Sequence, residues 1–165
     1  MPTAGHAHAA GDPGGLVLRD VEAVDLPSIV ALDHRLTAVA KPDYWRATIE
    51  RYGGGPPDRF FLVAETPDGA LAGFVIGEIR AWEFGAPPAG WIFAIEVDPD
   101  ARLAGIGTRL FDAICARFRT SGVDRVRTMV DRKDHLILSF FRSQGLTAGP
   151  SIELERLIDQ GAGAP

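Results

Sequence analysis

The chain has 165 residues, of which 46% are hydrophobic and 24% are charged, and its formal net charge is −5. This length fits one domain with a sizeable core, and the acidic balance argues against a nucleic-acid-binding surface. No apolar run approaches the roughly 20 residues that a membrane span needs. The single cysteine, Cys115, excludes an internal disulfide and fits a reducing cytoplasm.

The two ends of the chain differ in composition from its middle. Residues 1–14 are small and rich in Gly and Pro, with neither the basic nor the apolar region of a secretory signal. We therefore expect a disordered tail over 1–14, one domain over 15–158, and a flexible end over 159–165.

Hydrophobic periodicity and turn residues predict an alternation of strands and helices along the domain. In chain order we expect a strand at 16–19, helices at 26–36 (capped by Asp25) and 42–52, strands at 60–65, 70–80 and 91–97, a helix from 106 to about 121, a strand at 125–130, a helix at 134–143 and a strand at 152–157. This order indicates one mixed α/β domain with helices on both faces of its sheet.

A glycine turn connects the strand at 91–97 to the helix that follows it. Gly105 and Gly107 flank Ile106 at the start of this helix, where unpaired backbone N–H groups attract phosphate. Residues 102–132 contain seven Arg and three Asp, so positive charge is concentrated around the turn. The pattern lacks the Gly-Lys-Ser/Thr ending of a P-loop and the third glycine of a dinucleotide fingerprint. It indicates diphosphate binding, with a plain strand-to-helix turn as the alternative.

Two motifs resemble those of the GCN5-related N-acetyltransferase (GNAT) superfamily. The first is Val97-x-Pro99-x-x-Arg102-x-x-Gly105-x-Gly107, and the second is the segment DHLILSFFRSQGL at 134–146. The element order is similar as well. The resemblance implies an α/β (α+β) fold, a single domain whose central mixed, mostly antiparallel sheet has splayed strands and is flanked by helices.

The resemblance also implies acetyl-CoA as the acyl donor, with no metal. Its pantetheine arm would lie along the strand that carries Ile95 and Val97, and the backbone of the glycine turn would hold its pyrophosphate. Asp134 and Phe141 of the second motif would complete this site. The cofactor-binding residues expected from the resemblance are therefore Ile95, Val97, Arg102, Leu103, Ala104, Gly105, Ile106, Gly107, Thr108, Asp134 and Phe141.

The catalytic groups are harder to assign. Phe141 stands where the family usually has the tyrosine that protonates the leaving thiolate, and a phenylalanine has no proton to give. Strict alternation sets Trp91, Phe93, Ile95 and Val97 on one face of their strand and Ile92, Ala94 and Glu96 on the other. Glu96, in an otherwise apolar strand, is a candidate base with a raised pKa, or else a glutamate paired with an arginine. Glu78, on the neighbouring strand, is a second candidate, or else a solvent-facing carboxylate.

The acceptor is expected to be a primary amine. The segments LDHRLT at 32–37 and KPDYW at 41–45 resemble those of members that acetylate protein lysines, and a small-molecule amine is the alternative. Asp33 is expected on a solvated helix face or beside the substrate. A non-catalytic domain that binds acetyl-CoA as a sensor also stays open because of Phe141. The resemblance further suggests a homodimer, and nothing in the sequence points to a nucleic-acid or membrane partner.

Overall fold

The computed structural model describes residues 15–101 and 105–156, and the predicted tails at 1–14 and 159–165 lie outside them. Within this part of the chain, two short 3₁₀ turns accompany the main elements. These are β1 (Val17–Asp20), α1 (Leu26–Thr37), α2 (Pro42–Tyr52), β2 (Arg59–Glu65), β3 (Leu71–Arg80), β4 (Ala89–Val97), α3 (Ile106–Thr120), β5 (Val126–Thr128) and α4 (His135–Ser143). No helix among them is long and apolar enough to cross a membrane.

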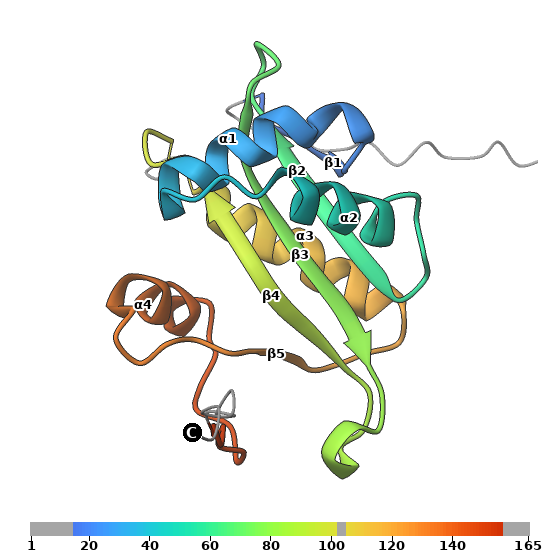
Figure 1. The fold of residues 1–165 in the computed structure, drawn as a ribbon. Coiled ribbons are helices and arrows are strands. Elements are labelled where there is room, and N and C mark those ends of the chain that lie inside the picture. The colour runs from blue at the N-terminus through green and yellow to red at the C-terminus, as the bar shows by residue number, and fades with distance from the viewer. Residues whose placement is uncertain (1–14, 102–104, 157–165) are drawn as a thin grey trace, which may run out of the picture.

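The strands form one five-stranded sheet in the order β1-β2-β3-β4-β5. The first four pair antiparallel, and β5 pairs parallel to β4. The α1–α2 pair covers one face of the sheet and α3 covers the other, with α4 beyond β5 (Figure 1). The mixed, mostly antiparallel sheet flanked by helices on both faces is therefore confirmed.

Each face of the sheet has its own apolar core. On one face Ile29 of α1 and Trp45 of α2 pack over Phe74 of β3. On the other, Leu110 and Ile114 of α3 lie over the opposite side chains of the same strands. Burial of this much apolar surface is the main force that holds the helices to the sheet.

A β-bulge interrupts the alternation of β4. Ile76 pairs with Ala94 and the next residue of β3, Gly77, pairs with Ile92, so Phe93 has no partner in β3. An extra residue reverses the facing of everything on one side of it. Ile92 accordingly joins the α3 core with Ile95, while Phe93 contacts Tyr52 of α2. The prediction of strict alternation from residue 91 to 97 was wrong for this reason.

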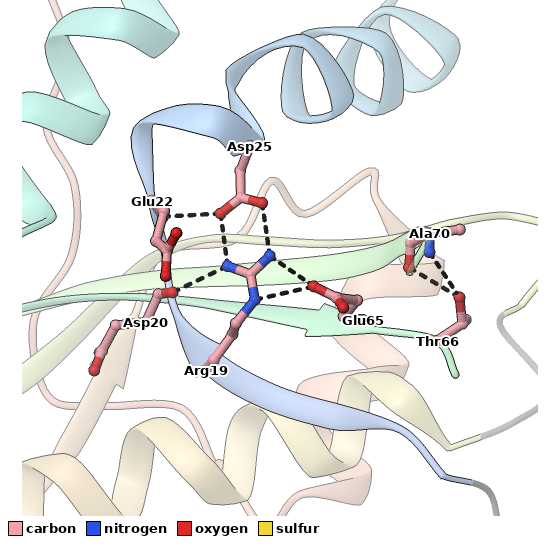
Figure 2. Close-up of polar contacts among 7 residues, drawn as sticks. All are labelled: Arg19, Asp20, Glu22, Asp25, Glu65, Thr66 and Ala70. Atoms are coloured by element: carbon pink, nitrogen blue, oxygen red, sulfur yellow. Dashed lines mark hydrogen bonds and ion pairs between the residues drawn. The ribbon is translucent and has the colours of Figure 1, made fainter. Parts of the chain in front are cut away.

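The start of α1 is tied to the sheet by an arginine cluster (Figure 2). The guanidinium of Arg19 in β1 donates to both oxygens of Asp25, each at 2.8 Å, and to Glu65 of β2 at 2.7 Å. Burial by itself would raise the pKa of Asp25, but the hydrogen bonds from Arg19 and the Glu22 N–H and the charge of Arg19 together outweigh it, and the pKa lies below its usual value. Asp25 precedes α1 as predicted, although its carboxylate binds Arg19 and the Glu22 N–H instead of the first turn of α1.

The last predicted strand is wrong. Residues 152–156 form no strand, and Ile152 and Leu154 are 76% and 86% exposed; residue 157 lies outside the described part. Their alternating pattern has the strand period, but a strand needs a hydrogen-bonded neighbour. The preceding strand in the chain, β5, stands at the edge of the sheet and is three residues long, so it offers almost no edge to pair with.

Candidate functional site

The strands β4 and β5 separate after a short paired stretch. They pair at three positions, the last being Ile92 with Thr128, and β4 then continues to Val97 without a neighbour on that side in the described part of the chain. The opening is a cavity of about 240 Å³. Its walls are Ile92, Phe93, Ala94, Ile95 and Glu96 of β4, Thr128 and Met129 at the end of β5, and Ile137 and Phe141 of α4. The splayed strands that the sequence predicted are therefore confirmed.

This separation leaves one edge of β4 open. On its other side β4 pairs with β3 along its length except at the Phe93 bulge, for example Ile95 with Val75 and Val97 with Gly73. Backbone N–H and C=O groups on the open edge need partners, and an extended ligand can supply them as an added strand would. Ile95 lines the cavity and Val97 follows at its end, so both lie where an extended arm could run.

The glycine turn follows β4 in the chain, and glycine is favoured at its two positions for different reasons. Gly105 has a φ of +69°, a left-handed conformation that favours glycine, and it precedes the first residue of α3. A Cβ on Gly107 would lie 3.1 Å from the Phe140 ring, so the close approach of α4 leaves little room for a side chain there. Arg102, Leu103 and Ala104 lie outside the described residues.

The first turn of α3 has the geometry that attracts anions. The amides at Ile106, Gly107 and Thr108 are the first of the helix and have no acceptor within it. Thr108 is exposed, and its Oγ1 lies 3.2 Å from Nε2 of Gln144 after α4. Arg109 extends away from the turn, since its Nη2 donates to the Leu16 carbonyl at 3.0 Å.

An arginine of α1 anchors the approach to this turn. Arg35 donates to the two carboxylate oxygens of Asp98 at 2.8 and 3.1 Å and to Asp100 at 2.9 Å. A bidentate arginine fixes the position of a carboxylate as well as balancing its charge. The segment between β4 and the glycine turn is thereby joined to the helix on the opposite face of the sheet.

The second motif forms α4 and closes the cavity. Asp134 caps this helix, because its Oδ1 accepts the Ile137 N–H at 3.0 Å. Phe141 is buried against Phe111 and Phe140 and also lines the cavity. Thus Phe141 forms an apolar wall of the site.

Glu96 is the carboxylate of the cavity. It lies opposite Phe74 of β3, on the face covered by α1 and α2, and its Oε2 is buried without a hydrogen-bond partner in the described structure. Burial, and to a smaller extent the nearby Asp33 carboxylate, raise the pKa of Glu96 to about 7 against the opposing effect of Lys41. An arginine partner, the alternative for this residue, is not found in the part of the chain that the structure describes.

Glu78 has a different environment on the same face. Its Oε2 accepts the Tyr52 hydroxyl at 2.6 Å and its Oε1 accepts Nε of Arg80 at 2.9 Å. Burial alone would raise the pKa of Glu78, but these two donors outweigh it, and the pKa is lowered. Glu78 is therefore neither the solvent-facing carboxylate of the alternative nor an unpaired base.

Sequence reasoning missed the group of residues behind Glu96. Asp33 is fully buried, whereas a solvated helix face was the stronger expectation. It accepts hydrogen bonds from Trp45 Nε1 at 2.8 Å and pairs with Lys41 Nζ at 2.9 Å. The signal was present, because Asp33 is four residues after Ile29 and so falls in the buried stripe of α1. No group of three or more metal-ligating side chains occurs in the described ranges.

Comparisons with known proteins agree with this architecture. The model of the acetyltransferase (GNAT) family matches residues 26–146. A mycothiol acetyltransferase of Propionibacterium freudenreichii is 30% identical over 152 residues, covering 89% of this chain and 47% of that protein. Another, from Thermobispora bispora, is 34% identical over 92 residues, covering 55% of this chain and 30% of that protein. The chain thus spans half or less of the length of these two relatives.

A solved structure extends the likeness to the whole fold. An aminoglycoside N-acetyltransferase in complex with CoA superposes with a TM-score of 0.74 at 16% identity, covering 90% of this chain and 98% of that one. At this identity the likeness concerns the fold alone.

Proposed function

The chain belongs to the acetyltransferase (GNAT) family, and we propose that it transfers the acetyl group of acetyl-CoA to the amine of a small molecule. One observation carries this proposal: Glu96 lines the cavity between β4 and β5, and its buried Oε2 has no partner in the described structure. A buried carboxylate without a donor is costly, and a donor arriving with the substrate offsets that cost. A substrate ammonium is such a donor.

The donor side of the proposal rests on two backbone elements. The open edge of β4 at Ile95 and Val97 would pair with the pantetheine arm, and the first amides of α3, from Gly105 to Thr108, would hold the pyrophosphate. An amide near Val97 would donate to the acetyl oxygen as negative charge develops there. Among the remaining expected residues, Phe141 would pack against the arm, and Asp134 would act by fixing the start of α4. Arg102, Leu103 and Ala104 stay predictions from the motif.

The chemistry then requires one base. Glu96 takes a proton from the substrate ammonium, and the free amine attacks the acetyl carbon. A C–N bond forms and the nitrogen gives up its second proton to solvent as it becomes an amide, while the C–S bond breaks and CoA leaves as a thiolate. Phe141 cannot protonate it, but a thiol with a pKa near 8.5 is an adequate leaving group, and solvent supplies the proton. A pKa of about 7 suits Glu96 to this role near neutral pH.

The acceptor is proposed to be a small-molecule amine. The relatives carry names of mycothiol acetyltransferases, and no comparison supports the protein lysine that residues 32–37 and 41–45 suggested. Phe93 is 42% exposed at the bulge, lines the same cavity as Glu96, and has Tyr52 at 5.3 Å between ring centroids. An exposed aromatic ring beside a carboxylate can bind the carbon skeleton of an amine while the carboxylate receives its nitrogen.

A charge substitution at the start of α3 tests the donor site. Thr108→Glu places a carboxylate in the first turn, where the helix dipole favours it, so the melting temperature should hold or rise. The same charge repels a diphosphate, and CoA affinity measured by calorimetry should fall at least tenfold. Thr108→Gln, which loses the same hydroxyl without adding charge, is the control. Equal CoA affinity in the two variants would refute the proposed diphosphate site.

Release of thiol from acetyl-CoA tests transfer itself. Turnover that depends on an added small-molecule amine supports the proposal. Tight CoA binding without thiol release across a broad panel of amines would instead favour the acetyl-CoA sensor, the reading that Phe141 leaves open. Turnover with lysine-containing peptides alone would return the acceptor to a protein.

A further inference from the structure

A buried ion pair lies behind Glu96 and belongs to no part of the reaction described above. Asp33 of α1 is 0% exposed, and Nζ of Lys41, in the connection between α1 and α2, lies 2.9 Å from its Oδ1. The other oxygen of Asp33 accepts Nε1 of Trp45 at 2.8 Å. Donors on both oxygens fix this carboxylate in one position, while the Lys41 side chain reaches solvent with 37% of its surface exposed.

Packing connects the pair to the cavity. The Trp45 ring lies 5.1 Å from the Phe74 ring, centroid to centroid, and Phe74 is the strand partner of Glu96. Asp33 and Glu96 thus belong to the same layer, between α1 and the sheet. The Oε2 of Glu96 has no hydrogen bond of its own among the described residues, so burial and nearby charges together set its preference for the neutral or the ionised form.

Among the described residues, the other side chains that line the cavity around Glu96 carry no charge. Its neighbour on β3 is Phe74, and the remaining walls of the cavity are Thr128, Met129, Ile137 and Phe141. Within the described part of the chain, the charged groups that shift the pKa of Glu96 are Asp33 from α1 and Lys41 from the α1–α2 connection. Screening by salt is weak at such a site, and single charges act strongly.

We infer that the Asp33–Lys41 pair is a positioning and tuning device that sets how readily Glu96 accepts the proton of the acceptor amine. The inference rests on the proposed function, in which Glu96 is the base. The two members of the pair, Asp33 and Lys41, act on the ionisation of Glu96 in opposite directions. The negative charge of Asp33 disfavours ionised Glu96, and the positive charge of Lys41 favours it.

The test is the pH profile of kcat/KM for the acceptor, with an amine that titrates well above the range scanned. Activity rises with pH as Glu96 ionises. Asp33→Asn keeps an acceptor for Trp45 and removes the negative charge, so the acidic limb should move to lower pH by about one unit. Lys41→Met removes the positive charge and should move the limb to higher pH. Lys41→Arg keeps the charge and should leave the limb in place.

The position of a limb does not depend on how much of a variant is folded, so partial destabilisation does not obscure the result. Lys41→Met leaves the buried Asp33 carboxylate without its counter-ion, so this variant could fail to fold. The Asp33→Asn/Lys41→Met double variant provides a second measurement in that case. In that variant neither Asp33 nor Lys41 leaves an unpaired charge behind, and the limb should fall between those of Asp33→Asn and Lys41→Met. If Lys41→Met yields no protein, the limb of the double variant should lie at a higher pH than that of Asp33→Asn.

Three outcomes separate the inference from its premise. Limbs that stay in place, or that move in the same direction in both single variants, overturn the inference and leave the proposed function intact. A Glu96→Gln variant that keeps the wild-type limb overturns the assignment of the base. A wild-type protein without turnover on any amine overturns the proposed function, and the inference with it.

Discussion

Two glutamates on adjacent strands of the same sheet face have opposite surroundings. Glu78 accepts hydrogen bonds from Tyr52 and Arg80, which lower its pKa against the effect of burial. Glu96 has a buried oxygen without a donor in the described structure, and its pKa is raised to about 7. Both are glutamates on strands of the same sheet. Their pKa values differ because α2 and β3 supply hydrogen-bond donors to Glu78, namely Tyr52 and Arg80, and none to Oε2 of Glu96 in the described structure. A carboxylate left unpaired in a cavity is available for proton transfer, whereas a paired one stabilises the fold.

The largest effect that follows concerns catalysis. Glu96→Gln should lower kcat by about 100-fold or more, because a general base typically contributes a factor of 10² to 10⁴. The KM for acetyl-CoA should stay the same, and the rise in rate through pH 7 should vanish. Glu78→Gln is the matched control, with kcat within about threefold of wild type once its lower stability is allowed for. Equal losses of kcat in the two variants would abolish the distinction between the two carboxylates.

The same substitutions should change stability in opposite directions. The folded-state pKa of Glu96 is raised, so its stabilising contribution is complete below the unfolded pKa near 4.3 and is lost as the pH rises through 7. The free energy of unfolding of Glu96→Gln, relative to that of the wild type, should therefore increase from pH 5 to pH 8 by at most about 3 kcal/mol. Urea unfolding at both pH values measures this gap, and a gap that does not widen with pH contradicts the raised pKa.

Glu78 shows the reverse sign. Its folded-state pKa is lowered, so its contribution is present above the unfolded pKa and is lost as the pH falls through the folded value. Glu78→Gln should cost about 1–2 kcal/mol at pH 7, since it weakens two hydrogen bonds to a charged acceptor. The difference from wild type should shrink in acid. A constant difference down to pH 3 would mean that the ionised carboxylate is not what Tyr52 and Arg80 stabilise.

The sequence predicted most of the fold because its signals are local. The glycines around Ile106, the helical stripe of α3 and the Asp134 cap each act within a few residues, and the structure has all three. What it could not predict depends on contacts distant in sequence. The bulge at Phe93 appears only when β4 pairs with β3, and strict alternation misassigned Ile92 as a result. The strand expected at 152–157 lacks the neighbour that a strand needs.

The candidate site divides in the same way. Glu96 could be proposed from one polar residue in an apolar strand. Its lack of a partner could not, because that depends on α1, α2 and β3 together. Asp33 was misassigned to a solvated face because an acidic residue in an amphipathic helix is usually exposed. The Trp45 and Lys41 donors that allow its burial come from beyond the end of α1, out of reach of the periodicity that describes one helix.

The smallest expected effect concerns the hydroxyl of Tyr52. Tyr52→Phe removes the 2.6 Å hydrogen bond to Glu78 but keeps the ring that packs beside Phe93. The loss should be about 1 kcal/mol of unfolding free energy, measured by urea denaturation, with kcat within about twofold of wild type. Desolvation and Glu78 raise the pKa of Tyr52 to about 12, so the hydroxyl is protonated at every pH of the assay. A tenfold drop in kcat would instead indicate that Tyr52 donates a proton during transfer, in place of the tyrosine that the family usually has at position 141. Glu78, which accepts the hydrogen bond of Tyr52, would then also take part in the reaction.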